Sequence, residues 1–107
     1  MIKVDFFTDD KGLLLGFDMY GHAEYDEHGQ DIVCAAVSSA AYLTINMISE
    51  IIKIPADINV KNTGGMYLKI KEDYANLCRD ILLGFKLHML NLEEQYPQNI
   101  TVNYMEV

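Results

Sequence analysis

The chain has 107 residues, enough for one packed core and too few for a second. Half of the residues are apolar, 22% are charged and only two are proline, which excludes a disordered chain. The formal net charge of −8 argues against a nucleic-acid-binding protein, because such proteins neutralise phosphates with Lys and Arg. Residues 1–31 hold eight acids against two lysines, so the acidic surplus lies in the first third of the chain and favours a neutral or basic partner.

The N-terminus carries charges from the third residue, and we therefore expect no signal peptide. We find no apolar run approaching the ~20 residues that a membrane span needs. Two cysteines, Cys34 and Cys78, are too few for a disulfide scaffold, and a cytosolic chain keeps them reduced. We expect a cytoplasmic protein with no membrane contact and at least one free thiol.

The first half of the chain predicts a hairpin followed by a loop and a helix. Residues 2–6 alternate in polarity, residues 9–12 form a turn, and the alternation resumes at Leu13, Leu15, Phe17 and Met19. Residues 21–31 break all periodicity and hold four acids. A helix is expected from Ile32 to about Ile52, with Asp31 as its N-cap and Pro55 beyond its end. Its apolar stripe is expected to contain Cys34, Ala41, Ile45, Ile48 and Ile52, with Ser38 on the same side.

The second half predicts two short strands, a second helix and a last strand. Ile58 and Val60 indicate the third strand, residues 62–65 a turn, and residues 66–71 the fourth strand. Asp73 is expected to cap the second helix, which Pro97 follows, and residues 100–104 form the fifth strand. The helix stripe is expected to contain Tyr74, Leu77, Cys78, Ile81, Phe85, Met89 and Leu92.

The element order is therefore ββαββαβ. Two amphipathic helices and about five short strands pack most simply as an α+β fold, with a mixed sheet in one layer and both helices on one of its faces. No linker or repeat divides the chain, so residues 1–107 are expected to form a single two-layer domain.

The loop and the first helical turn contain the residue types that folding alone does not require. A thiol at Cys34, expected in the first turn, is biased toward thiolate by the free N–H groups and the positive end of the helix dipole. His22 precedes Cys34 by twelve residues, and the intervening loop is long enough to bring the imidazole beside the thiol as its base. Asp31 could cap the helix or orient His22, and Ser38 could donate a supporting hydrogen bond.

Simpler interpretations stand beside this one. Cys34 could be an inert core residue, because free cysteine is among the most often buried residue types. His28 competes with His22 as the base, although neighbouring acids favour an exposed loop residue. Cys78 and His88 are interpreted as structural. A redox-sensing thiol is the weakest alternative, since Cys78 would be a poor resolving partner.

Metal and cofactor sites are not expected. His22, His28, Cys34 and a carboxylate could supply four zinc ligands, but no C-x-x-C or H-x₃₋₅-H pair is present. Gly64-Gly65 lies between two strands, which is typical of a hairpin turn rather than of a phosphate-binding loop.

Gly21-His22-Ala23, followed by Gly29-Gln30-Asp31-Ile32-Val33-Cys34-Ala35-Ala36-Val37-Ser38, resembles the signature of the ribosomal-processing cysteine proteases, the Prp family. The resemblance covers essentially the whole chain. It implies a cytosolic cysteine endopeptidase with Cys34 as nucleophile and His22 as catalytic histidine. Asp31 and Ser38 match further motif positions and are carried over as supports, and Gly21 and Gly29 match the glycines that bound a mobile loop.

The resemblance also implies a substrate and an assembly state. The substrate would be the precursor of large-subunit ribosomal protein twenty-seven, whose N-terminal extension the protease removes, and the protease would be a homodimer. Glu24, Asp26, Glu27 and Asp31 would attract this basic substrate. The alternative function is a non-catalytic acidic module that binds a basic ribosomal partner.

Overall fold

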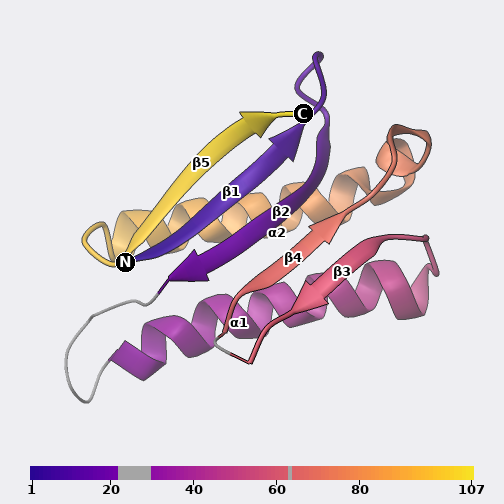
Figure 1. The fold of residues 1–107 in the computed structure, drawn as a ribbon. Coiled ribbons are helices and arrows are strands. Elements are labelled where there is room, and N and C mark those ends of the chain that lie inside the picture. Colours follow the sequence, from indigo (N-terminus) through magenta and orange to yellow (C-terminus); the bar gives the residue numbers. More distant parts are fainter. Residues whose placement is uncertain (22–29, 63) are drawn as a thin grey trace.

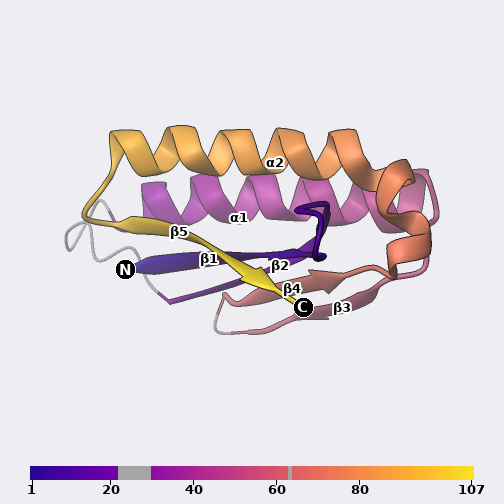
Figure 2. The same cartoon turned by 90° about the horizontal axis from the view of Figure 1, so that it is seen from above.

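The computed structural model describes residues 1–21, 30–62 and 64–107, and of Gln30 and Asp31 it describes the backbone. A five-stranded sheet has the order β3-β4-β2-β1-β5, and both helices cover one of its faces (Figures 1 and 2). The strands are β1 (Ile2–Thr8), β2 (Leu14–Gly21), β3 (Asp57–Val60), β4 (Met66–Lys69) and β5 (Ile100–Glu106). β1 and β5 are parallel and the other neighbours antiparallel, so the predicted mixed sheet and two-layer α+β architecture are confirmed.

The β1–β2 hairpin closes through a turn at Asp9, whose Oδ1 accepts hydrogen bonds from the N–H groups of Lys11 and Leu13 at 2.9 and 2.8 Å. Before Gly16, the prediction of which β2 side chains face the main core was wrong. The register shifts between Phe7 and Thr8, so Leu14 enters the main core and Leu15 joins a second cluster. A bulge of this kind adds a residue without a sequence signal of its own, and period-2 reasoning therefore fails across it.

The first helix, α1 (Gln30–Asn46), continues into a π-helical turn, η1 (Met47–Ile51). It begins two residues before the predicted Ile32, so Asp31 lies inside the first turn instead of at the N-cap. Val33, Val37, Ala41, Ile45 and Ile48 form the buried stripe. Cys34 and Ser38 are half-buried at its edge, and Ile52 is exposed.

The expectation of no apolar run long enough to span a membrane was also wrong. Residues Ile32–Ile51 form a helical segment of 20 residues with mean hydropathy 1.6, the only candidate within the described parts of the chain. Length and composition alone select this segment, and core helices of soluble proteins pass the same test. The apolar residues of this segment form two groups. One is the buried stripe against the sheet, and the other is an exposed outer face that includes Leu43 and Ile51.

The second helix, α2 (Ala75–Gln95), follows a short 3₁₀ turn, η2 (Glu72–Tyr74). Asp73 therefore lies in the 3₁₀ turn, and the residue at the N-cap, Tyr74, makes no side-chain capping bond. The predicted stripe was wrong at Leu77, which is exposed, and it missed Leu82, which is fully buried. Cys78, Phe85, Met89 and Leu92 are buried as predicted, so the phase of the stripe is correct and the error concerns its edges.

Candidate active site

Cys34 is the described nucleophile nearest the start of α1. It is half-buried and packs against the main core from the edge of the buried stripe. Because α1 begins at Gln30, Cys34 is its fifth residue, at the start of the second turn and not in the first turn as predicted. A helical side chain leans toward the N-terminus, however, so the thiol still lies over the first turn.

The backbone N–H of Cys34 takes part in the helical ladder. In an α-helix that starts at Gln30, this N–H is directed to the carbonyl of residue 30. The Cys34 N–H is therefore not among the donors that this helix end leaves without an intrahelical partner. The N–H groups of residues 30–32, which precede the thiol, have no intrahelical partner in a helix that starts at Gln30.

The end of β2 leads toward the same helix start. Gly21 is the last residue of β2, with φ of 93°, and a Cβ there would lie 2.2 Å from the carbonyl oxygen of Met1. An L side chain is therefore excluded by both conformation and space. This glycine fixes the point at which the chain leaves the sheet, and His22 is the next residue.

Several predicted site residues lie outside the described residues: His22, Gly29, the competing His28 and the loop acids Glu24, Asp26 and Glu27. The side chain of Asp31 is also outside them. Ser38 is half-buried one turn after Cys34, on the same side of α1. The structure thus places Gly21, Cys34 and Ser38, while the position of His22 against the thiol stays a prediction.

The second thiol has a different environment. Cys78 is fully buried in α2, and this burial raises the pKa of the thiol because the thiolate is disfavoured away from water. Its interpretation as a core residue is confirmed. His88, interpreted as structural, is exposed and borders a cavity of about 390 Å³ between α1 and α2.

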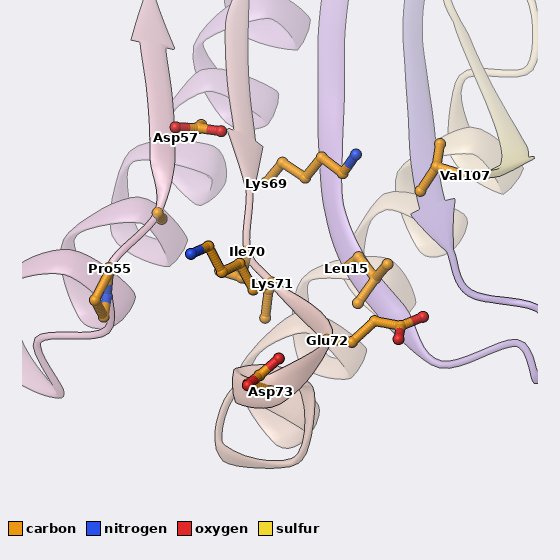
Figure 3. Close-up of a pocket in the computed structure, with 10 residues that line it drawn as sticks. Leu15, Pro55, Asp57, Lys69, Ile70, Lys71, Glu72, Asp73 and Val107 are labelled. Carbon is orange, nitrogen blue, oxygen red and sulfur yellow. The ribbon is translucent and has the colours of Figure 1, made fainter.

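Figure 3 shows a cavity of about 590 Å³. Lys69, Lys71, Asp57 and Glu72 surround it, and no cysteine, histidine or serine lines it. Pro55, at its rim, follows the C-terminal end of the helix that carries Cys34. At a rise of 1.5 Å per residue, Cys34 and Ile51 are roughly 25 Å apart. This cavity is therefore not the site of the nucleophile.

The uncovered face of the sheet holds an acidic pair that sequence reasoning missed. Asp5 and Asp18 are direct cross-strand partners, and the Tyr20 hydroxyl donates a hydrogen bond to Asp5 Oδ2 at 2.9 Å. Burial, opposed by nearby Lys61 and reinforced by Asp5, raises the pKa of Asp18. The hydrogen bond to Asp5 raises the pKa of Tyr20. The period-2 pattern put Asp5 on the outward face, but only the register reveals its partner.

A single-domain α+β fold that presents one half-buried thiol over the start of a helix has the features of a cysteine hydrolase. Comparison with known proteins is more specific. The sequence model of the family described as Cysteine protease Prp matches residues 1–101. The chain belongs to this family, and it is a cysteine protease; the non-catalytic alternative is thereby set aside.

Individual relatives agree. The Ribosomal processing cysteine protease Prp of Staphylococcus aureus (strain Mu50) is 33% identical over 108 residues, covering 97% of this chain and 99% of the relative. The protein of the same name from Bacillus subtilis (strain 168) is 30% identical, covering 89% of this chain and 88% of the relative. A crystal structure of the S. aureus protease with a covalently linked product peptide superposes with a TM-score of 0.87, at 31% identity and covering 98% of this chain and all of that one. A second, with a substrate peptide, gives 0.85 at 30% identity, with the same coverage.

Proposed function

We propose that this protease removes the N-terminal extension from the precursor of large-subunit ribosomal protein twenty-seven during ribosome assembly in the cytoplasm. Cys34 is the nucleophile and His22 the general base. The observation that carries the proposal is the half-buried Cys34 thiol over the first turn of α1, at the helix end toward which Gly21 directs the chain.

The helix start activates the thiol. Free N–H groups and the positive end of the helix dipole stabilise an anion, and the lean of the side chain brings the sulfur over them. His22 adds a base that removes the thiol proton, or a cation that stabilises the thiolate. Partial exposure of Cys34 leaves room for a peptide carbonyl to approach.

The reaction is acyl transfer in two steps. His22 takes the thiol proton, and the Cys34 sulfur bonds to the scissile carbonyl carbon. The C–N bond then breaks as His22 returns the proton to the leaving amine, leaving a thioester. Water, deprotonated by His22, attacks the thioester, and the thiol and the new carboxylate are released. The N–H groups of residues 30–32 are the candidate donors to the oxyanion.

The remaining motif residues act as supports in this proposal. Gly21 sets the exit of the chain from β2, immediately before the base. Gly29 bounds the other end of the loop before α1. In this proposal Asp31 orients His22, and Ser38, one turn after Cys34 on α1, donates a supporting hydrogen bond.

The ribosomal substrate is supported by charge and by the names of the relatives. Ribosomal proteins are basic because they bind RNA, and this chain carries a net charge of −8 concentrated in its first third. Both the S. aureus and the B. subtilis relatives are named as ribosomal-processing proteases.

The test is to incubate the purified protein with the extended precursor and to follow the product by mass spectrometry. We expect one cleavage that releases the extension with wild type and none with Cys34→Ala. Cleavage by Cys34→Ala at the wild-type rate would exclude Cys34 as the nucleophile. No cleavage by the wild type would exclude this precursor as the substrate.

We also propose that the protease acts as a homodimer that buries the outer face of α1. This face continues from α1 into η1 and carries Tyr42, Leu43, Met47 and Ile51, all exposed, with Glu50 as the charged residue among them. Beside it, Gly84 of α2 has open space where a Cβ would lie, so another helix could approach closely. Exposed apolar area of this kind marks an interaction surface.

A further inference from the structure

The sheet has two edge strands, and they differ in whether their outward-facing backbone groups are hydrogen-bonded. β3 forms one edge and β5 the other (Figure 1). An edge strand presents unpaired N–H and C=O groups that another extended chain can pair with, unless side chains or loops occupy them. The occupancy of each edge therefore shows where a peptide could add as a further strand.

At the β3 edge the register identifies the outward residues. The N–H of Lys61 donates to the carbonyl of Gly65 at 2.8 Å, and these two residues continue the β3–β4 pairing. Hydrogen-bonded pairs alternate along an antiparallel ladder, so Asn59 and Asp57 also face β4. The N–H and C=O groups of Ile58 and Val60 therefore point away from the sheet. Within the described part of the chain, no group bonds to them.

At the β5 edge the corresponding groups are partly occupied. The N–H of Val107 donates to Thr8 at 2.9 Å, which assigns the odd-numbered residues of β5 to the pairing with β1. Of the outward residues, Ile100 donates to the Tyr96 carbonyl at 3.1 Å, and Val102 donates to Glu93 Oε2 at 2.7 Å. A carboxylate of α2 thus closes the middle of this edge, whereas β3 has no such cover among the described residues.

We propose that the free edge of β3 binds an extended segment of the peptide substrate as a sixth strand of the sheet. This inference rests on the proposed function. Ile58 and Val60 would each exchange backbone hydrogen bonds with the peptide, which is how extended peptides add to sheet edges elsewhere. The relative from S. aureus has been crystallised with a substrate peptide, so peptide binding is within the capacity of this fold.

The side chains of β3 specify the chemistry of that segment. Ile58 and Val60 pair with buried Leu68 and Met66, so they lie on the helix-covered side, yet they are 39% and 41% exposed. A peptide strand beside them would cover these side chains with every second residue of its own. The segment is therefore apolar at alternate positions.

The sheet register also gives the separation of this edge from the end of β2, the strand that precedes His22 in the sequence. Val60 is opposite Met66, and Met66 is opposite Met19, two residues before the end of β2. A sixth strand would lie three strand spacings, about 14 Å, from β2. An extended chain covers about 3.3 Å per residue, so roughly four residues or more would separate the bound segment from a position at the end of β2.

The experiment compares two peptides from the precursor, a long one that includes the flanking segments and a short one limited to three residues on each side of the cleavage site. Val60→Pro removes one outward donor without removing a β3–β4 hydrogen bond. We expect it to lower kcat/KM for the long peptide about tenfold, from lost peptide hydrogen bonds, and to leave the short peptide unaffected. Glu106→Pro, at an outward position of β5, is the matched control and should cleave both peptides as wild type does.

A second measurement leaves the protein unchanged. Single N-methyl groups are placed in turn along the flanking segments of the long peptide. We expect loss of kcat/KM at every second position of one segment, because alternate N–H groups of an added strand face β3. Equal kcat/KM for Val60→Pro and wild type on the long peptide, or insensitivity to every methyl group, would overturn the inference while leaving the protease intact. Failure of the wild type to cleave either peptide would instead refute the proposed function.

Discussion

The carbonyl of Met1 closes the space beside Gly21, the residue that ends β2 and precedes the proposed base. A Cβ at Gly21 would lie 2.2 Å from that oxygen, and the residue has φ of 93°. Two adjacent strands thus hold the chain where it leaves the sheet. The backbone geometry alone therefore requires a glycine at this position.

Gly21→Ala should therefore lower both stability and activity. A left-handed conformation costs a non-glycine residue about 1–2 kcal/mol, and the clash with Met1 adds to this cost. Thermal unfolding and peptide cleavage measure the two effects. Gly64→Ala is the matched control, since Gly64 has φ of 95° but open space around a Cβ. Equal losses of stability for the two variants would show that the Met1 contact is unimportant.

The two thiols should differ in reactivity under native conditions. Cys34 is half-buried and Cys78 is fully buried, so iodoacetamide should label Cys34 in the native protein and Cys78 only after unfolding. Mass spectrometry of the native and denatured protein would identify each labelled site. Native labelling of Cys78 at a rate comparable to that of Cys34 would contradict the packing of α2 against the sheet.

The pH dependence of Cys34 alkylation tests the proposed dyad. An activated thiolate reacts well below the pH at which an ordinary thiol does, and the His22→Ala variant should lose this advantage. The same variant should lower kcat by about 10²- to 10⁴-fold, the usual contribution of a general base. His28→Ala, in the same loop, is the control and should leave both properties unchanged. Identical alkylation profiles for wild type and His22→Ala would rule out the dyad.

Asp18 should affect stability in a pH-dependent way. Burial raises its pKa above the usual 3.8, so the folded state holds the proton more tightly than the unfolded state. Folding is therefore disfavoured while Asp18 is ionised, and this penalty is relieved as the pH falls through the folded-state pKa toward 3.8. Asp18→Asn should raise Tm at pH 7, with a smaller gain as the pH falls toward that range. Asp57→Asn, on exposed β3, is the control, and an equal gain there would exclude burial as the cause.

The element order, the two helices and the hairpin turn at residues 9–12 follow from apolar periods of two and 3.6 residues and from turn-forming residues, and these parts were predictable. The order of the strands in the sheet was not predicted. One error arose where the backbone changes phase: the bulge at Leu15 places Leu14 in the main core and Leu15 in the second cluster. In α2 the predicted stripe had the correct phase but the wrong edges, since it included the exposed Leu77 and missed the buried Leu82.

The candidate active site was likewise predictable only in part. Cys34 and Gly21 were identified by residue type and motif, and the structure gives each a physical reason. The role of Asp31 depended on a helix boundary, which a shift of two residues changes from a cap to a first-turn position. The Asp5–Asp18 pairing and the free edge of β3 depend on strand register, and one sequence carries no direct signal of it.

The outer face of α1 gives the last prediction. Leu43 is 62% exposed in the middle of this face and also borders the cavity between the two helices. In a dimer that buries the face, a charge at position 43 would be removed from water without a partner, at a cost of several kcal/mol. Leu43→Glu should therefore dissociate the dimer in analytical ultracentrifugation while the monomer stays folded. Leu77→Glu, at an equally exposed leucine of α2 away from the cavity lining, is the control and should remain dimeric. Dissociation by Leu77→Glu alone would move the interface to the start of α2, and a wild type that sediments as a monomer would refute the dimer itself.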